Sequence, residues 1–316
     1  MRLAHISDLH VLDLKGIKPW RFLNKRVTGG LNLLLGRSKI HRPELLDLAL
    51  AKIEALGCDH IAVTGDVSNL ALESEFRRVK ELLAGPIAAH KLSVVAGNHD
   101  RYTLGSVLTR RFDVAFEALI QTDLPQLPSV HGWPYVKLLG DVALIGLNTA
   151  VAQPIAVSGG RVGHKQLEAL QHVLKHPDVE ARYSVVMMHH HMFKPANKKR
   201  EFPRGLSDRK EVLEVLLEGK ADLVIHGHNH YYSTRTHPRS SNGSGVMVVC
   251  EAGSTTIARA HKDPNRDGKF NTYDIEHGRL SQVTTYRFVS GPGFVPWRRW
   301  GFDNRTPIRL PLALEQ

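Results

Sequence analysis

Five short segments of the chain end an apolar run with Asp, Asn or His side chains. They read ISDLH (6–10), VTGDVSN (63–69), VVAGNHD (94–100), VVMMHHH (185–191) and VIHGHNH (224–230). Imidazole nitrogens combined with carboxylate and amide oxygens form a ligand set that suits Mn, Fe, Zn or Co. Each segment alone fits an ordinary turn after a strand, but five of them together indicate a metal site.

The number of these side chains exceeds what one catalytic metal requires. A single catalytic metal takes about three protein ligands, and the five segments supply seven plausible ones. A set of that size can hold two ions roughly 3.5–4 Å apart, bridged by a carboxylate. Such a pair lowers the pKa of a bridging water and binds phosphate oxygens, so the sequence predicts phosphoester hydrolysis.

Strands and helices alternate along the chain around these segments. Nearly continuous apolar runs, typical of strands covered on both faces, occur at 3–6, 60–64, 92–96, 142–147, 184–188, 223–226 and 246–250. Apolar spacing predicts helices within 42–57, 73–84, 112–120, 164–175 and 208–218, and a hairpin joins 271–276 to 280–288. Because sites gather at the carboxyl ends of strands in α/β sheets, we expect the five segments to share one rim.

The composition favours an anionic partner. The 316 residues include 42 Lys and Arg against 31 Asp and Glu, which suits nucleic acid, acidic lipid or a phosphorylated small molecule. No apolar stretch is long enough to span a membrane. An apolar strand begins within three residues of Met1, so we expect no signal peptide and a cytoplasmic location. Cys58 and Cys250 adjoin apolar runs and are interpreted as buried free thiols.

The combination of D-x-H, G-D-x-x-N, G-N-H-D, a strand-ending histidine run and G-H-x-H resembles the calcineurin-like metallophosphoesterase superfamily over roughly residues 1–288. The GNHD block is more similar to the cyclic-nucleotide-phosphodiesterase-like branch than to the serine/threonine phosphatases, which usually have GNHE. The resemblance implies an α/β fold built as a four-layer α/β/β/α sandwich of two mixed sheets. It also implies two divalent metal ions, Mn first and Fe or Zn as alternatives, with a metal-bridging hydroxide as the attacking group.

The resemblance assigns metal ligands to the matching positions. The first metal would be bound by Asp8, His10 and His230. The second metal would be bound by Asn98, His189 and His228. Asp66 would bridge both metals. The family often shows H-H-P where this chain has HHHMF. His189 is chosen because it lies closest to the strand, and His190 or His191 is in register instead if the strand ends later.

Four further residues are expected beside the metals. His99 would face the substrate phosphate, where it stabilises the transition state or protonates the leaving oxygen. Asp100 would orient His99. Asn69 would either hydrogen-bond a phosphate oxygen or cap the following helix. Arg101 is a candidate for binding phosphate, or else an ordinary surface residue.

Two segments fall outside the strand–helix alternation. The insertion at 15–42 carries eight Lys and Arg, no acidic residue and several large apolar side chains, and the tail at 289–316 is rich in Pro, Gly and Arg. Such segments can bind a membrane surface or an amphiphile with an anionic head. We therefore predict lipid contact through 15–42 and 291–302, at the inner face of the membrane. The alternative is that both segments pack on the body of the domain and extend their basic groups to solvent.

These features lead to a ranked set of functions. The first is a phosphodiesterase or pyrophosphohydrolase whose substrate is a lipid-linked nucleotide, such as UDP-diacylglucosamine, or a cyclic nucleotide. The second is a nucleic-acid-processing enzyme, although the sequence lacks an aromatic-rich stacking module. The third is a non-catalytic interaction module on the same fold, which the full set of ligand positions argues against.

Overall fold

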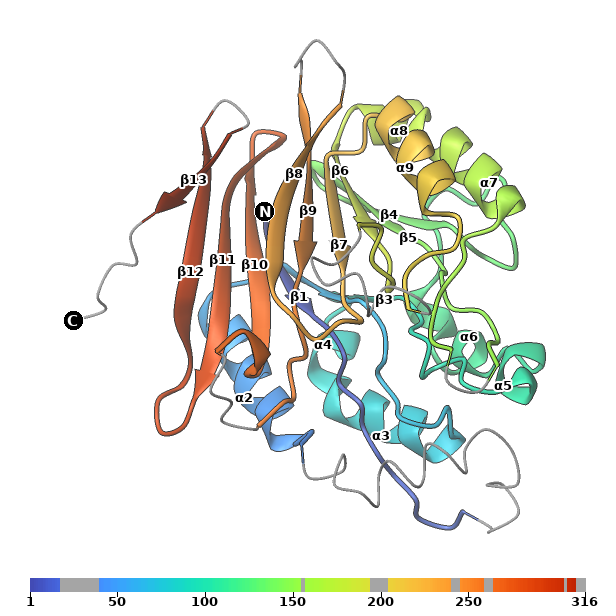
Figure 1. Cartoon of the computed structure of the whole chain (residues 1–316), viewed down its shortest axis with the longest axis vertical. Coiled ribbons are helices and arrows are strands. Elements are labelled where there is room, and N and C mark those ends of the chain that lie inside the picture. The colour runs from blue at the N-terminus through green and yellow to red at the C-terminus, as the bar shows by residue number, and fades with distance from the viewer. Residues whose placement is uncertain are drawn as a thin grey trace.

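In the computed structural model the described residues are 1–17, 40–154, 157–193, 204–239, 245–258, 264–303 and 306–310. Two mixed β-sheets form the centre of the fold (Figure 1). The first has the order β13 (Thr306–Leu310), β12 (Gly293–Asp303), β11 (Arg279–Val289), β10 (Lys269–Glu276), β1 (Arg2–Ile6), β2 (His60–Val63) and β3 (Leu92–Val94). The second has the order β4 (Tyr135–Leu139), β5 (Val142–Gly146), β6 (Tyr183–Met187), β7 (Leu223–His226), β9 (Val246–Glu251) and β8 (Ser233–Pro238).

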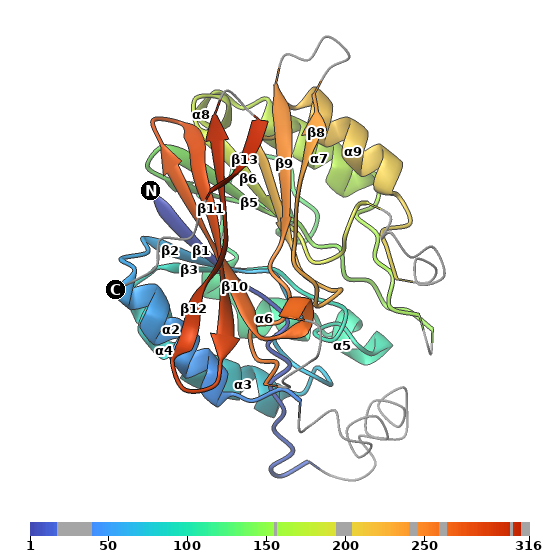
Figure 2. The same ribbon diagram turned by 60° about the vertical axis from the view of Figure 1, so that its left-hand side comes forward.

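Helices cover the outer face of each sheet (Figures 1 and 2). On the side of the first sheet lie α2 (Glu44–Ala55), α3 (Glu73–Leu82) and α4 (Ala84–Ala88). On the side of the second sheet lie α7 (His164–Leu174), α8 (Pro177–Glu180) and α9 (Arg209–Glu218). Two short helices, α5 (Leu104–Leu108) and α6 (Arg111–Ala115), lie between β3 and β4 in the sequence. The predicted α/β/β/α sandwich is confirmed.

Two hydrophobic cores explain why the predicted strands lack polar alternation. In β6, Val185 and Met187 belong to the core that includes residues of both sheets, whereas Val186 belongs to the core under α7 and α9. Both faces of this strand are buried, as its continuous apolar run indicates. The predicted hairpin also forms, because β10 and β11 pair in antiparallel fashion and both turn residues, His277 and Gly278, have positive φ.

The first sheet continues where the sequence analysis placed a separate tail. Strand β12 (residues 293–303) pairs with β11, and β13 (residues 306–310) pairs with the other edge of β12. Pro296 lies where the register shifts between Thr285 and Tyr286, and a bulge tolerates proline because the ladder is already interrupted there. Proline and glycine concealed this strand, and the first sheet extends beyond residue 288.

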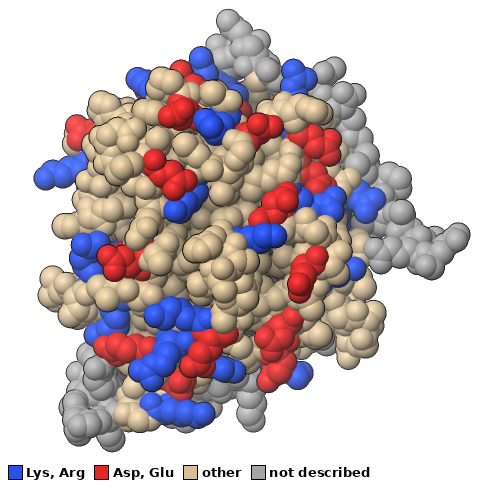
Figure 3. Space-filling model, turned by 180° about the vertical axis from the view of Figure 1, so that it is seen from behind, with Lys and Arg blue, Asp and Glu red and all other residues tan. Residues whose placement is uncertain are grey.

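Other differences are smaller. The helix expected at 112–120 is α6 followed by a 3-10 turn at Glu117–Leu119, and strands β4 and β8 were not predicted. Cys250 is buried and Cys58 half-buried, both as free thiols. None of the described helices is long and apolar enough to cross a membrane. On the face seen in Figure 3, basic and acidic side chains of the described residues lie intermixed.

Candidate metal centre

Five strand ends meet at one rim between the sheets. Asp8 and His10 follow β1, Asp66 follows β2, and the Asn98 loop follows β3. The second sheet contributes the histidines that follow β6 and β7. Backbone hydrogen bonds fix the first two loops together, because the amides of Asp8 and His10 donate to the carbonyls of Gly65 and Asp66 at 3.0 and 2.9 Å.

Three side chains form a first cluster of donor atoms. Nε2 of His230 lies 3.1 Å from Nε2 of His10 and 3.3 Å from Oδ1 of Asp8. Oδ2 of Asp66 lies 3.8 Å from Nε2 of His10. These nitrogen and oxygen atoms face one another as ligands around one ion do.

Three others form a second cluster. Oδ1 of Asn98 lies 2.9 Å from Nδ1 of His228 and 3.1 Å from Nε2 of His189. These two histidine nitrogens are 3.2 Å apart. Oδ2 of Asp66 is 3.4 Å from Nε2 of His189, so this one oxygen adjoins both clusters. The seven predicted ligands are therefore brought together, and Asp66 has the place of a bridge.

The electrostatics of the bridge suit a cation. Burial raises the pKa of Asp66, but His189 and His99 lower it more, and the net pKa lies well below its usual range. Burial lowers the pKa of His189, whereas Asp66 raises it, to about 9. Without metal a positive imidazolium lies beside the negative carboxylate. The mixed N and O donor set, whose members are buried or half-buried, fits two divalent ions of the Mn, Fe, Zn type.

The ligands sit on an unusual backbone. Asp8, His10, Asp66, His228 and His230 have φ between 47° and 82°, a region that residues other than glycine rarely adopt. Such conformations cost about 1–3 kcal/mol each and persist where the surrounding structure enforces them, commonly at functional sites. The strand-end loops thus turn sharply to aim donors from two sheets at one point.

Glycines in the motifs allow these loops to approach closely. A Cβ atom at Gly97 would lie 2.2 Å from Oδ1 of Asp66, and one at Gly227 would lie 2.4 Å from Oδ2 of Asp8. The G of G-N-H-D and the G of G-H-x-H are therefore required by contact with a ligand carboxylate.

A model of the calcineurin-like phosphoesterase family matches residues 1–232. The chain belongs to this family. A comparison with curated protein sequences gives no match. The fold of this calcineurin-like phosphoesterase is similar to that of a dimetal phosphatase from Danio rerio, with 15% identity, a TM-score of 0.57, and coverage of 90% of this chain and 94% of the other.

It is also similar to purple acid phosphatase PPD1 from yellow lupin, Lupinus luteus. Here the identity is 14%, the TM-score is 0.59, and 94% of this chain aligns with 52% of the lupin chain, so the likeness spans about half of that protein. Family membership and the donor clusters together make the chain a metal-dependent phosphoester hydrolase.

The hydrogen bonds of the histidine run distinguish its members in this calcineurin-like phosphoesterase. Nδ1 of His189 donates to the carbonyl of Thr64 at 2.7 Å, which leaves Nε2 for a metal. In His190, by contrast, Nδ1 lies 2.8 Å from the Thr149 hydroxyl and Nε2 lies 3.0 Å from the Ser158 carbonyl. Both ring nitrogens of His190 are occupied, so the geometry favours His189 as the ligand.

The third member, His191, stacks on the ring of His228, with centroids 5.8 Å apart. Its ring therefore packs against that of a candidate ligand, and the groups of possible metal donors found among the described residues do not include His191.

His99 lies beside the bridge, but its partner differs from the expected one. Nδ1 of His99 donates to the carbonyl of Asn69 at 2.7 Å. Asp100 instead accepts hydrogen bonds from the amides of Gly97, Val67 and Ser68. The predicted orienting role of Asp100 is wrong: its carboxylate ties two ligand loops together, and burial followed by the nearby carboxylate of Asp66 raises its pKa to about 7.

Asn69 and Arg101 also have structural partners. The buried side-chain amide of Asn69 donates to the carbonyl of His10. Because α3 begins only after Leu72, Asn69 does not cap this helix, and its contact with a phosphate stays a prediction. Arg101 is buried and donates twice to Asp113, at 2.6 and 2.7 Å. The placement of Arg101 therefore does not support phosphate binding.

The sequence patterns did not identify one histidine that lies near the candidate metal centre. His41 lies near the end of the insertion, and its ring centroid is 4.5 Å from that of His10 and 5.6 Å from that of His230. No strand-end motif marks it, and its only signal in the sequence is its place before the predicted helix at 42–57.

Proposed function

We propose that this chain hydrolyses phosphodiester or pyrophosphate bonds with two Mn²⁺ ions bound by the seven ligands. The observation that carries the proposal is the place of His99. Its ring lies edge-on to the ligand His10, with centroids 4.8 Å apart, and stacks on Tyr102 at 5.4 Å. Nδ1 of His99 donates to the carbonyl of Asn69 at 2.7 Å, and this hydrogen bond fixes the orientation of the ring beside the two clusters.

A histidine beside two metal ions suits the hydrolysis of phosphoesters that have a poor leaving group. The two ions, when bound, would activate a water and bind phosphate oxygens. The imidazole of His99, when protonated on both ring nitrogens, can then donate the proton of Nε2 to the leaving oxygen or stabilise the charge that builds on the phosphate. Its backbone amide meanwhile holds Oδ1 of Asp66, so the bridge and the acid are positioned by the same residue.

The proposed substrates are a lipid-linked nucleotide or a cyclic nucleotide. The insertion at 15–42 supports the first, because the chain is held at the rim on both sides of it. Val11, four residues before the insertion, bridges to Ser68, and His41, near its end, bridges to Ile257. Residues 18–39 of the insertion lie outside the described part of the chain. A lipid would bind through the basic and apolar side chains of this segment.

The tail supports lipid contact less. In β12, Phe294 is buried in the core, and Trp297 lies against Tyr232 with centroids 5.6 Å apart. The guanidinium of Arg298 stacks over Trp297 at 4.2 Å. These aromatic groups pack on the body of the domain, so we propose the insertion as the main lipid contact.

The test uses Mn²⁺-loaded protein in detergent with four substrates. Bis(p-nitrophenyl) phosphate and p-nitrophenyl phosphate separate diesterase from monoesterase activity, and cyclic AMP and UDP-diacylglucosamine are followed by mass spectrometry. Faster cleavage of the diester, absent in Asp66→Asn, supports the proposal. Exclusive cleavage of the monoester contradicts it. Among the natural substrates, loss of the lipid nucleotide alone assigns the insertion to lipid binding, and loss of cyclic AMP alone assigns it a structural role.

A further inference from the structure

His41 is held firmly at the rim of the metal centre. It pairs in an antiparallel bridge with Ile257. The amide of Arg42 donates to the carbonyl of Thr256, and the amide of Ala258 donates to the carbonyl of Ile40, both at 2.9 Å. The His41 residue is only 9% exposed. Its backbone is thus fixed on both sides, and its ring is not a loose surface group.

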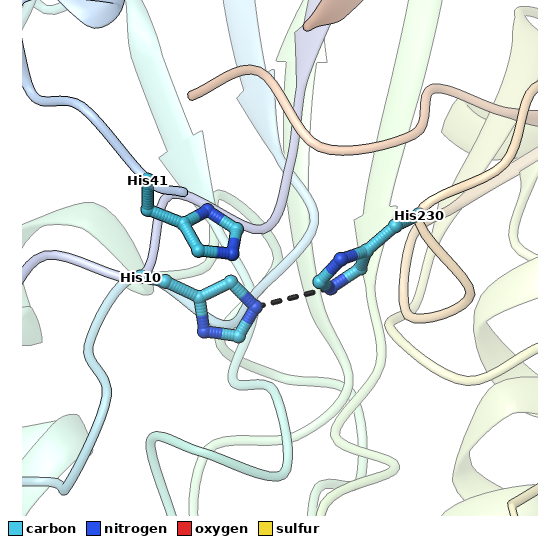
Figure 4. A group of neighbouring side chains, drawn as sticks. All are labelled: His10, His41 and His230. Carbon is cyan, nitrogen blue, oxygen red and sulfur yellow. Dashed lines mark hydrogen bonds between the residues drawn. The ribbon is translucent and has the colours of Figure 1, made fainter. Parts of the chain in front are cut away.

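The ring of His41 points at the first cluster of donors. Figure 4 shows His10, His41 and His230 with their rings directed toward one another. One nitrogen from each ring can be chosen so that all three lie within 4.8 Å of one another. Nitrogens bound at about 2.0–2.1 Å lie at most about 4.2 Å apart around one ion, so one ion would need only a small closing of these three rings.

Neighbouring hydroxyl groups decide the tautomer of His41. Nδ1 of His41 lies 2.9 Å from the hydroxyl of Thr256, and this hydroxyl donates its single hydrogen to the carbonyl of Leu9 at 2.8 Å. The hydroxyl must therefore accept a hydrogen from Nδ1. A second hydroxyl, that of Ser254, is 3.5 Å from Nδ1 and donates to the carbonyl of Asp8 at 2.7 Å.

A hydrogen on Nδ1 leaves the lone pair on Nε2, which is the state of a metal-binding imidazole. Ligand histidines almost always donate their other ring N–H to an oxygen in this way, which fixes the ring and raises its basicity. The hydroxyl groups that orient His41 also hold the backbone carbonyls of Asp8 and Leu9. His41 and the D-x-H loop are thus positioned by the same two side chains.

We propose that His41 is a further ligand of the first metal, beyond the set that the motifs specify. The first metal would then have five protein ligands: Asp8, His10, His41, Asp66 and His230. The second would have four, and would keep more room for a substrate phosphate. The inference rests on the metal centre of the proposed function and not on the identity of the substrate.

The test measures metal binding without any substrate. Metal-free wild type and His41→Ala are titrated with Mn²⁺ by calorimetry, and metal content is counted after gel filtration. We expect His41→Ala to bind one of two ions at least ~10-fold more weakly, the order seen when groups supporting a metal site are lost, and to retain the other. His10→Ala is the positive control, and His60→Ala, at a buried histidine hydrogen-bonded to Ser93, controls for loss of an imidazole elsewhere.

Cobalt provides a second readout. Loss of a nitrogen ligand lowers the coordination number, so the visible absorption of Co²⁺-loaded His41→Ala should become more intense than that of wild type. Unchanged Mn²⁺ affinity and an unchanged Co²⁺ spectrum would overturn the proposal and assign His41 to substrate contact instead. If both metals bind as expected but no phosphodiester is cleaved, the proposed function fails while this assignment stands.

Discussion

The backbone amide of His99 donates a hydrogen bond to Oδ1 of Asp66 over 2.7 Å. The carboxylate proposed to bridge the metals is therefore oriented by the main chain of the residue whose side chain is proposed to face the substrate. His99→Ala removes the imidazole and keeps this amide. We expect both metals to be retained and turnover of a diester to fall ~10²–10⁴-fold, the range for loss of a general acid. Metal content falling together with the rate would show that the imidazole supports the metals, contrary to its proposed role.

Asp66→Asn should empty both metal positions. Oδ2 of Asp66 lies beside the histidines of both clusters, at 3.8 Å from His10 and 3.4 Å from His189, and a neutral amide cannot supply the bridging charge. Elemental analysis after desalting would measure this. Asn98→Ala is the matched control, because Asn98 contacts only the second cluster and its loss should remove one metal. A full complement in Asp66→Asn would exclude the bridging role.

Two glycine variants should shift stability in opposite directions. A Cβ at Gly97 meets the backbone nitrogen and Oδ1 of Asp66 at 2.2 Å, whereas a Cβ at Gly105 in α5 meets nothing within 4 Å. Gly97→Ala should therefore lose about 1–3 kcal/mol of unfolding free energy from overpacking, together with metal affinity. Gly105→Ala should gain about 0.5–1 kcal/mol, since alanine favours a helix over glycine. Urea denaturation of both variants compares these free energies.

Arg101→Met should destabilise the fold without changing the KM for a diester. The side chains of Arg101 and Asp113 are 10% and 4% exposed and are joined at 2.6 Å. Breaking such a buried pair costs about 3–5 kcal/mol when one charge is left alone. The loss should lie near the lower value here, because Asp113 keeps Arg110 at 3.4 Å and the indole of Trp133 at 3.0 Å. Asp113→Asn should show a similar loss, and the double variant should lose less than the sum. A raised KM with normal stability would instead restore Arg101 as a phosphate-binding residue.

Buried His60 should make the metal-free protein less stable in mild acid. Burial, and to a lesser extent Lys137, lower the pKa of His60 to about 4 from its ordinary value of 6.5. Between these values the unfolded chain binds a proton that the folded protein does not, so stability is lost as pH falls from 6.5 toward 4. At pH 5 this one residue accounts for about 2 kcal/mol. Denaturation in chelator at pH 7.5 and 5.0 should show a smaller difference for His60→Gln, and an unchanged difference would contradict this.

Sequence patterns identified the candidate ligands because strand burial and strand ends are local signals. A continuous apolar run such as 184–188 predicts a strand covered on both faces. The polar residues that follow it must then lie at the rim of the sheet. The hydrogen-bond partners of a side chain, by contrast, often lie far away in the sequence, so no local pattern predicts them. Asp100 and Arg101 both follow GNHD, yet one binds loop amides and the other binds Asp113, a choice made only by tertiary packing.

His41 and β12 were missed for related reasons. His41 reaches the site through pairing with Ile257, a contact between distant parts of the chain that no periodicity reveals. In β12 the alternation of side chains is interrupted where Pro296 meets the register shift, so a strand pattern of period two is lost. The sequence could not show that the sheet tolerates proline at this point, since the tolerance comes from the partner strand.

The pairing of β1 has a consequence for the order of events during synthesis of the chain. This early strand lies between β2 and β10, and Arg2 pairs with Asp274. Every proposed ligand, from Asp8 to His230, is translated before β10 exists. A nascent chain can thus carry a full ligand set while one edge of β1 is still open, exposed to pairing with other chains. Completion of the sheet, and not synthesis of the last ligand, would set the time at which the metals are held.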